Sequence, residues 1–262
     1  MNLQRFADRV AVVTGGASPI GFGIAERLAA EGAHVVLGDF DSDRLAAAGE
    51  KLEATAPGRV DTVLGDLSRQ SDAAALIDAA AGRRGRLDVL INCAGGGVIR
   101  ATPEHTEQTL RATIDRNLWT TVYCSLAALP VMAEAGYGRI VNIGAESVRN
   151  GLYRHAIYNA AKGGVHALAT GLAREYAGHG ITVNVVAPAW ITTAEAEARL
   201  AVASEAERAD WDSFTTQMRS TIPMSRPGTV PEVAATVAFV ASDEASYITG
   251  QTISVNGGSS ML

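Results

Sequence analysis

Short apolar runs rich in β-branched residues recur along the chain. They are VAVVT (10–14), HVVLG (34–38), VDTVL (60–64), VLIN (89–92), RIVNI (139–143), TVNVV (182–186) and TISV (252–255). Between most of them lie Ala-, Leu- and Glu-rich stretches with helical spacing. Strands that alternate with helices predict parallel pairing through right-handed crossovers, and continuous apolar strands fit a sheet that is buried on both faces. The pattern therefore predicts an α/β fold, a doubly wound parallel sheet with helices on both faces.

No break in composition, internal repeat or low-complexity tract interrupts the pattern, so we expect one domain over residues 1–262. The exception is a long polar-helical insertion at about 194–221, whose inner face Trp211, Phe214 and Met218 could form at spacings of three and four. Such an insertion predicts either a lid over a substrate or an ordinary amphipathic helix pair.

Residues typical of helix ends mark where the predicted helices begin and end. Ser42 and Ser71 are predicted N-caps, Gly32 is a predicted C-cap, and Pro231 stands where a first-turn proline is tolerated.

Charge and cysteine content exclude several classes of function. The chain has 22 Lys and Arg against 28 Asp and Glu, a formal net charge of −6 without a basic run, so we expect no nucleic-acid partner. Cys93 and Cys124 lack metal-like spacing and the five histidines show no ligand-like pairing, so we expect neither a disulfide nor a metal site. No leader and no apolar run of about 20 residues is apparent, which predicts a cytoplasmic protein without a membrane partner.

The first strand runs into TGGASPIGFGIAERL (14–28), a glycine-rich turn that opens a helix. Glycines let the backbone approach a pyrophosphate, and the helix N-terminus supplies free N–H groups. We expect the turn to bind a dinucleotide through a set of four residues: Gly15, Ser18, Ile20 and Gly21. Asp39 ends the second strand, where an acid accepts hydrogen bonds from the adenosine ribose and repels a 2′-phosphate. Asp39 therefore favours NAD over NADP, and the alternative is a solvated turn residue.

Two further polar residues follow strands at the edge where ligands bind in doubly wound sheets. Asp66 follows the third strand and is predicted to contact adenine, whereas Asn92 follows the fourth and is predicted to stabilise the turn there. Either residue could instead be a simple loop cap. The remaining expected cofactor contacts near these strands are Leu67, Ala94 and Gly95.

Five motifs carry a family resemblance over essentially the whole chain. TGGASPIG, INCAG, the Asn of IDRNL, YNAAK and NVVAPAWITT, in this order and spacing, resemble the classical short-chain dehydrogenases/reductases. The narrower likeness is to enzymes that act on alicyclic secondary alcohols, cis-dihydrodiols or hydroxyacyl thioesters. The resemblance implies a Rossmann fold with seven strands in the order 3-2-1-4-5-6-7 and a nicotinamide cofactor. It also implies a homotetramer built on helices around 106–135 and 156–178 and on the last strand.

The resemblance also assigns roles. Tyr158 would be the catalytic acid/base, Lys162 would lower its pKa and hold the nicotinamide ribose, and Asn117 would anchor a water in a proton relay. A free phenol has a pKa of about 10, so proton transfer near neutrality needs a nearby cation, and positions i and i+4 share one helix face. The segment from Pro188 to Thr193 would cradle the nicotinamide and pyrophosphate, with the Ile191 backbone facing the carboxamide.

The chain departs from the family at the position thirteen residues before Tyr158. A serine there usually donates a hydrogen bond to the substrate oxygen, but here the residue is Ala145. Losing such a donor costs about 10²–10³ in rate. Ser147, on the same face of an extended segment, could replace it, the substrate could carry its own orienting group, or Ala145 could inactivate the protein. Glu146 is expected to be a solvated neighbour.

Pro19 replaces the middle fingerprint glycine, and we expect NAD still to bind, with lower affinity if the lost N–H serves the cofactor. Ala189 replaces the glycine after Pro188 and Cys93 replaces an asparagine, and we expect both to be tolerated. In the loop before Tyr158, Tyr153, Arg154 and His155 are expected either to shape the substrate pocket or to be solvated.

Together these features predict an NAD(H)-dependent oxidoreductase that interconverts a secondary alcohol and its ketone by hydride transfer. The alternative is a protein of the same fold that binds NAD without efficient turnover. Hydrolysis through Ser147 lacks a suitably placed histidine–carboxylate pair.

Overall fold

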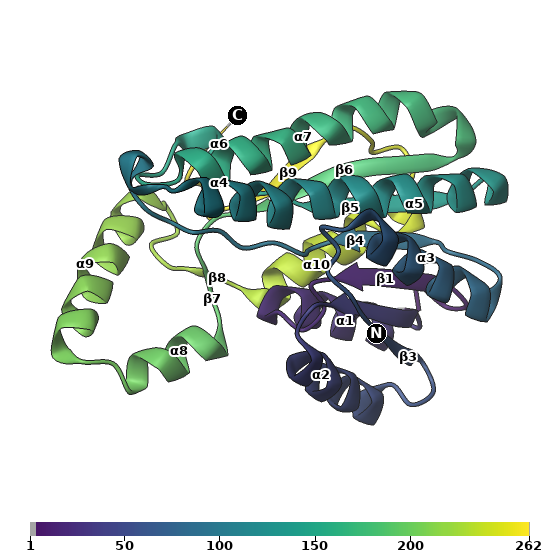
Figure 1. Ribbon diagram of the computed structural model, residues 1–262, viewed down its shortest axis with the longest axis horizontal. Coiled ribbons are helices and arrows are strands. Elements are labelled where there is room, and N and C mark those ends of the chain that lie inside the picture. Colours follow the sequence, from purple (N-terminus) through teal and green to yellow (C-terminus); the bar gives the residue numbers. More distant parts are fainter. Residues whose placement is uncertain (1–3, 262) are drawn as a thin grey trace.

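The computed structural model describes residues 4–261, which form one twisted parallel sheet between two layers of helices (Figure 1). The sheet order is β3-β2-β1-β4-β5-β6-β9, and every pairing is parallel. The strands are β1 (Val10–Thr14), β2 (His34–Asp39), β3 (Val60–Leu64), β4 (Val89–Asn92), β5 (Gly138–Ile143), β6 (Ile181–Pro188) and β9 (Thr252–Val255). The predicted seven-stranded order is confirmed, and the last strand is ninth along the chain because two short strands precede it.

Those two strands, β7 (Ile191–Thr192) and β8 (Gly228–Thr229), pair only with each other, so they bracket the insertion. The helices are α1 (Pro19–Ala30), α2 (Ser42–Thr55), α3 (Gln70–Arg84), α4 (Glu107–Ile114), α5 (Thr120–Ala135), α6 (Ser147–Asn150), α7 (Ala156–Tyr176), α8 (Ala194–Ala201), α9 (Glu205–Thr221) and α10 (Val230–Val240).

Alternate residues of each strand build the two halves of the core. In β1, Ala11 and Val13 join the cluster formed with α1, α2 and α10, whereas Val10 and Val12 join the cluster formed with α3, α5 and α7. Successive strand residues point to opposite faces, so a strand buried on both sides must be apolar throughout. This burial fixes the helix layers, and the parallel direction of all the strands brings their carboxyl ends to one edge.

Two of the cap predictions are wrong. Asp41, not Ser42, caps α2 by accepting a hydrogen bond from the Arg44 N–H at 3.1 Å, and Arg69 occupies the N-cap position of α3 without a side-chain bond. Ser71 instead bonds Asp72. The predicted caps lie one or two residues inside the helices, where neighbouring polar residues made the boundary ambiguous.

The insertion is a helix pair, α8 and α9, which reaches out from the body as an arm (Figure 1). Trp211 and Phe214 of α9 cluster with Trp190, with ring centroids 5.6 to 6.5 Å apart, and Met218 is buried. The predicted inner face of this segment is therefore present in the structure.

Residues 107–135 form a continuous helical stretch that, by length and composition alone, is apolar enough to cross a membrane. One side of it packs into the core through residues such as Cys124, Leu129 and Met132, while Trp119 and Leu126 are exposed on the other. Core helices of soluble proteins pass the same test, so this stretch is weak support for a membrane span.

Candidate active site

The glycine-rich turn between β1 and α1 is held in a shape that only glycine permits. Gly15 has φ +63°, and a Cβ there would lie 2.8 Å from the Ala94 Cα. A Cβ at Gly21 would lie 2.2 Å from the Gly15 carbonyl oxygen. The Ser18 hydroxyl donates to that same oxygen at 2.7 Å and accepts from the Gly21 N–H at 3.1 Å, which caps α1. Pro19, at the first position of α1, is tolerated as expected.

Asp39 points back into this turn from the end of β2. Its carboxylate accepts from the Ala17 N–H at 3.1 Å, the Phe40 N–H at 2.8 Å and the Asp41 N–H at 3.2 Å, and only 7% of the residue is exposed. Asp39 is therefore not a solvated turn residue. A fixed acid beside a tight glycine turn and a helix N-terminus is a donor and acceptor set that fits a dinucleotide.

Three of the predicted cofactor residues have other partners. The Asn92 amide is buried and donates to Ser125 Oγ at 3.0 Å and Asn142 Oδ1 at 2.8 Å, so its side chain joins β4 to α5 and β5. Leu67 lies in the core. Asp66 is exposed and accepts from the Ser68 hydroxyl at 2.7 Å. Asp66 thus has the loop-cap arrangement, and its contact with adenine stays a prediction.

Asn117 lies in a π-helical turn, Asp115–Trp119, between α4 and α5. Its amide donates to the Gly96 and Thr113 carbonyl oxygens at 2.9 and 2.8 Å, and its oxygen accepts from the Gly96 N–H at 3.1 Å. A Cβ at Gly95 would come 2.8 Å from that oxygen. Asn117 therefore fixes the loop after β4 to the helical stretch of α4 and α5, and its predicted water stays a prediction. Single π turns inside helices often mark functional sites.

Tyr158 and Lys162 lie one turn apart on α7, as the spacing predicts, but their pKa shifts differ from expectation. Burial, with a smaller contribution from Cys93, raises the pKa of Tyr158 to about 12. Burial lowers the pKa of Lys162 to about 8, and Nζ donates to the Ile143 carbonyl oxygen at 2.7 Å. Desolvation by burial dominates the pKa of Tyr158, so its net shift is opposite to the lowering expected from Lys162.

The segment after β5 corrects two further expectations. Ser147 begins the helix α6 and does not lie in an extended segment; it is buried, and its hydroxyl donates to Asn159 Oδ1 at 2.6 Å. Glu146 is not solvated but 1% exposed, and it accepts from the Ser260 hydroxyl near the C-terminus. Ala145 donates its backbone N–H to His166 Nε2 at 3.4 Å, and burial lowers the pKa of His166 to about 4.

These elements enclose a cleft of about 620 Å³. Its lining includes the predicted cofactor residues Ser18, Ile20, Gly95, Lys162, Pro188, Ile191 and Thr193. A second group of lining residues, named here the substrate end, comprises Ala145, Ser147, Leu152, His155, Tyr158, Trp190, Phe214 and Met218. A mostly apolar cleft with a few polar groups that converge on it is the usual form of a small-molecule site. Ala189 has no positive φ, so the loss of glycine there costs no backbone strain.

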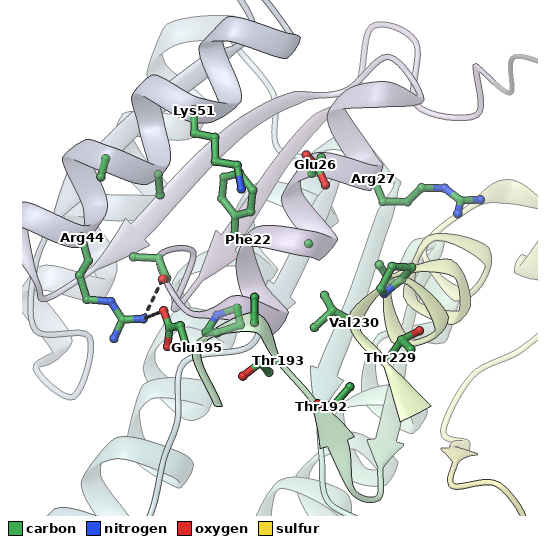
Figure 2. A pocket seen from close by; sticks show the side chains of 18 of the residues that line it. Phe22, Glu26, Arg27, Arg44, Lys51, Thr192, Thr193, Glu195, Thr229 and Val230 are labelled. Atoms are coloured by element: carbon green, nitrogen blue, oxygen red, sulfur yellow. Dashed lines mark hydrogen bonds and ion pairs between the residues drawn. The ribbon is translucent and has the colours of Figure 1, made fainter. Parts of the chain in front are cut away.

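A second cleft, of about 800 Å³, lies between α1, α2, the start of α8 and α10 (Figure 2). Arg44 of α2 reaches across its edge, where its guanidinium donates to the Glu195 carboxylate at 2.8 Å and to the Ala17 carbonyl oxygen at 3.2 Å. Thr193 and Glu195 line both clefts, so the base of the arm forms the partition between them. The sequence had shown no cation in the glycine turn, yet the fold brings one beside it.

Sequence reasoning missed two groups around the site. Trp190 lies within the predicted Pro188 to Thr193 segment, but its place in the aromatic cluster of the arm was not predicted. His166 lies one turn beyond Lys162 on α7, and an i+4 repeat after a catalytic residue is a signal that could have identified it.

Comparison with known proteins agrees with this geometry. Residues 15–260 match the family model described as Enoyl-(Acyl carrier protein) reductase. The chain is 51% identical over 261 residues to 2,3-dihydroxy-2,3-dihydro-p-cumate dehydrogenase from Pseudomonas putida, covering 100% of this chain and 98% of that protein. It is 40% identical over 257 residues to 1,6-dihydroxycyclohexa-2,4-diene-1-carboxylate dehydrogenase from Pseudomonas putida, covering 97% and 94%.

The crystal structure of levodione reductase superposes with a TM-score of 0.88 at 34% identity, covering 97% of this chain and 98% of that one. The sheet order, the site and these matches lead to one assignment. The chain belongs to the classical short-chain dehydrogenases/reductases and is an oxidoreductase that acts on CH–OH groups.

Proposed function

We propose that this protein is an NAD(H)-dependent dehydrogenase of cyclic vicinal diols, interconverting one secondary carbinol and its ketone. The observation that carries the proposal is that Tyr158, Lys162 and the glycine turn between β1 and α1 line one cleft, whose lining is mostly apolar. The names of two relatives describe ring compounds with hydroxyls on adjacent carbons, which supports a diol.

The roles of the side chains follow from their surroundings. A nicotinamide cofactor, when bound, supplies the hydride acceptor. Tyr158 takes the hydroxyl proton of the carbinol as its carbon–hydrogen bond is broken, and Lys162 supplies the positive field that favours phenolate. Asn117 keeps the loop of Gly95 and Gly96 against both residues. The aromatic cluster of Trp190 and Phe214 excludes water from the substrate end.

NAD rather than NADP is part of the proposal. Asp39 is the negative group nearest the glycine turn, and three backbone N–H groups hold it there. Its charge opposes a 2′-phosphate.

Initial rates with NAD and a panel of cyclic diols and simple cyclic alcohols, followed by nicotinamide absorbance, test the proposal. We expect NADH formation with a diol and loss of nearly all activity in Tyr158→Phe, with NAD binding retained in a separate titration. Robust activity in Tyr158→Phe would overturn the assigned role, and absence of turnover with every diol would overturn the substrate class.

The second candidate function is NAD binding without efficient turnover. Two observations favour it: Ala145 offers no hydroxyl, and the Ser147 hydroxyl donates to Asn159. Tight NAD binding together with a large gain of activity in Ala145→Ser would support this candidate.

We further propose a homotetramer in the cytoplasm. The stacked pair Trp119 and Tyr123 and the exposed Leu126 give the outer side of residues 107–135 an apolar face suited to a second copy of the chain. Cys93 and Cys124 are free thiols, as expected in a reducing compartment. Light scattering after gel filtration tests the tetramer; a monomer at micromolar concentration would contradict it.

A further inference from the structure

We infer that His155 binds the second hydroxyl of the diol, the one that is not oxidised, and so makes the site selective for vicinal diols over simple alcohols. This inference rests on the proposed function. His155 occupies the N-cap position of α7 without capping it, and it lines the substrate end of the cleft. Its ring stands edge-on to that of Tyr158, with centroids 6.0 Å apart and an angle of 80° between the planes.

The hydrogen bond of His155 fixes which of its nitrogens is available. Nδ1 lies 2.8 Å from the Tyr153 carbonyl oxygen. A carbonyl oxygen can only accept, so Nδ1 carries the hydrogen, and Nε2 of the neutral ring holds a lone pair. Nε2 has no hydrogen-bond partner among residues 4–261. It can therefore accept a hydrogen bond from a substrate hydroxyl.

The other polar side chains of the cleft are already engaged. Ser18 bonds the glycine turn, Ser147 donates to Asn159, and Thr193 caps α8. Glu195 is paired with Arg44. Among the described residues that line the cleft, the Tyr158 hydroxyl and His155 Nε2 have no hydrogen-bond partner, and their rings are in edge-on contact. Two such groups suit the two adjacent oxygens of a vicinal diol.

Backbone strain supports the same assignment. Arg154, directly before His155, has φ +65°, a conformation that costs a non-glycine residue free energy. The turn is held by the hydrogen bond from the His155 N–H to the Leu152 carbonyl oxygen at 3.2 Å. Strain of this kind persists where the surrounding structure enforces it, and here it brings the imidazole to the cleft.

The test compares cis-cyclohexane-1,2-diol with cyclohexanol in the wild-type protein, His155→Phe and His155→Gln. Loss of one neutral hydrogen bond predicts that His155→Phe lowers the diol-to-alcohol ratio of kcat/KM by roughly 3- to 10-fold, with cyclohexanol changed less than about 2-fold. His155→Gln, which keeps an acceptor, should recover part of the ratio. Tyr153→Phe is the matched control, because that side chain is exposed while its carbonyl oxygen is retained.

A binding measurement separates this inference from the proposed function. Calorimetric titration of the diol into Tyr158→Phe with NAD present, with and without His155→Phe, needs no turnover. Weaker diol binding in the double variant supports the inference even if the wild-type protein proves to be a poor catalyst. Unchanged diol binding in the double variant, or no diol binding to Tyr158→Phe, would overturn it.

Discussion

The Ser147 hydroxyl lies 2.6 Å from Asn159 Oδ1 and donates its only hydrogen there. Ser147 lines the same cleft as Ala145 and stands two residues after it in the sequence. A hydroxyl has one hydrogen, and because the Ser147 hydroxyl donates its hydrogen to Asn159, it cannot donate to a substrate oxygen. The compensating donor expected from the sequence is therefore present in the cleft but committed elsewhere.

The first prediction follows directly. Ala145→Ser should raise kcat by up to about 10²-fold, because it supplies a hydrogen bond that strengthens in the transition state. Initial rates on the diol at saturating NAD measure the change.

The matched control is Ser147→Ala, which should alter kcat by less than about 3-fold if its hydrogen bond to Asn159 is only structural. A hundredfold loss in Ser147→Ala, with no gain in Ala145→Ser, would instead identify Ser147 as the donor and would require the Asn159 amide to be reversed.

Lys162→Met should stabilise the fold while abolishing activity. The pKa of Lys162 falls from 10.5 in the unfolded chain to about 8 in the fold, so below pH 8 the native state bears the cost of a buried ammonium group. Between pH 8 and 10.5 the unfolded state binds more protons, so wild-type stability rises with pH in that window.

At pH 7 we expect the free energy of unfolding of Lys162→Met to exceed that of the wild-type protein by about 2–3 kcal/mol. This difference should shrink toward pH 10.5. Urea unfolding at pH 7, 8.5 and 10 measures it. A variant less stable than the wild type at pH 7 would show that the bond to the Ile143 carbonyl oxygen outweighs desolvation.

His166 predicts sensitivity to acid. Its pKa is lowered from 6.5 to about 4 by burial, with Arg149 and Lys162 adding to the effect. Between pH 6.5 and 4 the His166 imidazole is therefore protonated in the unfolded state and neutral in the native state. The free energy of unfolding falls as the pH is lowered through this range. His166→Gln keeps an acceptor for the Ala145 N–H and should remove roughly 1–2 kcal/mol of this loss.

Unfolding free energies at pH 7, 5.5 and 4.5 test this difference. The exposed His179 provides the control: His179→Gln should leave the profile unchanged. Parallel profiles for the wild type and His166→Gln would contradict the assignment to His166.

Asp39→Ser should change the choice of cofactor. Removing the carboxylate eliminates charged hydrogen bonds to the ribose and leaves Arg44, which contacts the same turn through Ala17, as the nearest cation (Figure 2). We expect the KM for NAD to rise about 10-fold and the NAD-to-NADP ratio of kcat/KM to fall by about 10².

The double variant, Asp39→Ser with Arg44→Ala, should lose the increase in kcat/KM for NADP that Asp39→Ser alone shows. Equal NADP activity with and without Arg44 would show that only the loss of repulsion matters.

Much of this protein is determined by its sequence alone. The seven apolar runs become the seven strands within one or two residues, because burial on both faces of a sheet demands continuous hydrophobicity. Tyr158 and Lys162 lie on one face because of helical geometry. Gly15 and Gly21 could be identified from the glycine-rich motif, and the structure has no room for a side chain at either position.

Only the tertiary structure decided how these residues are surrounded. Glu146 is buried and accepts a hydrogen bond from Ser260, 114 positions away, and Arg44 donates to the Ala17 carbonyl oxygen of the glycine turn from α2. The direction of the Tyr158 pKa shift, the engagement of Ser147 and the free nitrogen of His155 depend likewise on neighbours brought together through space. Local patterns encode periodicity and turns, whereas burial and hydrogen-bond pairing are set by contacts between distant segments, so these properties could not be predicted from the sequence.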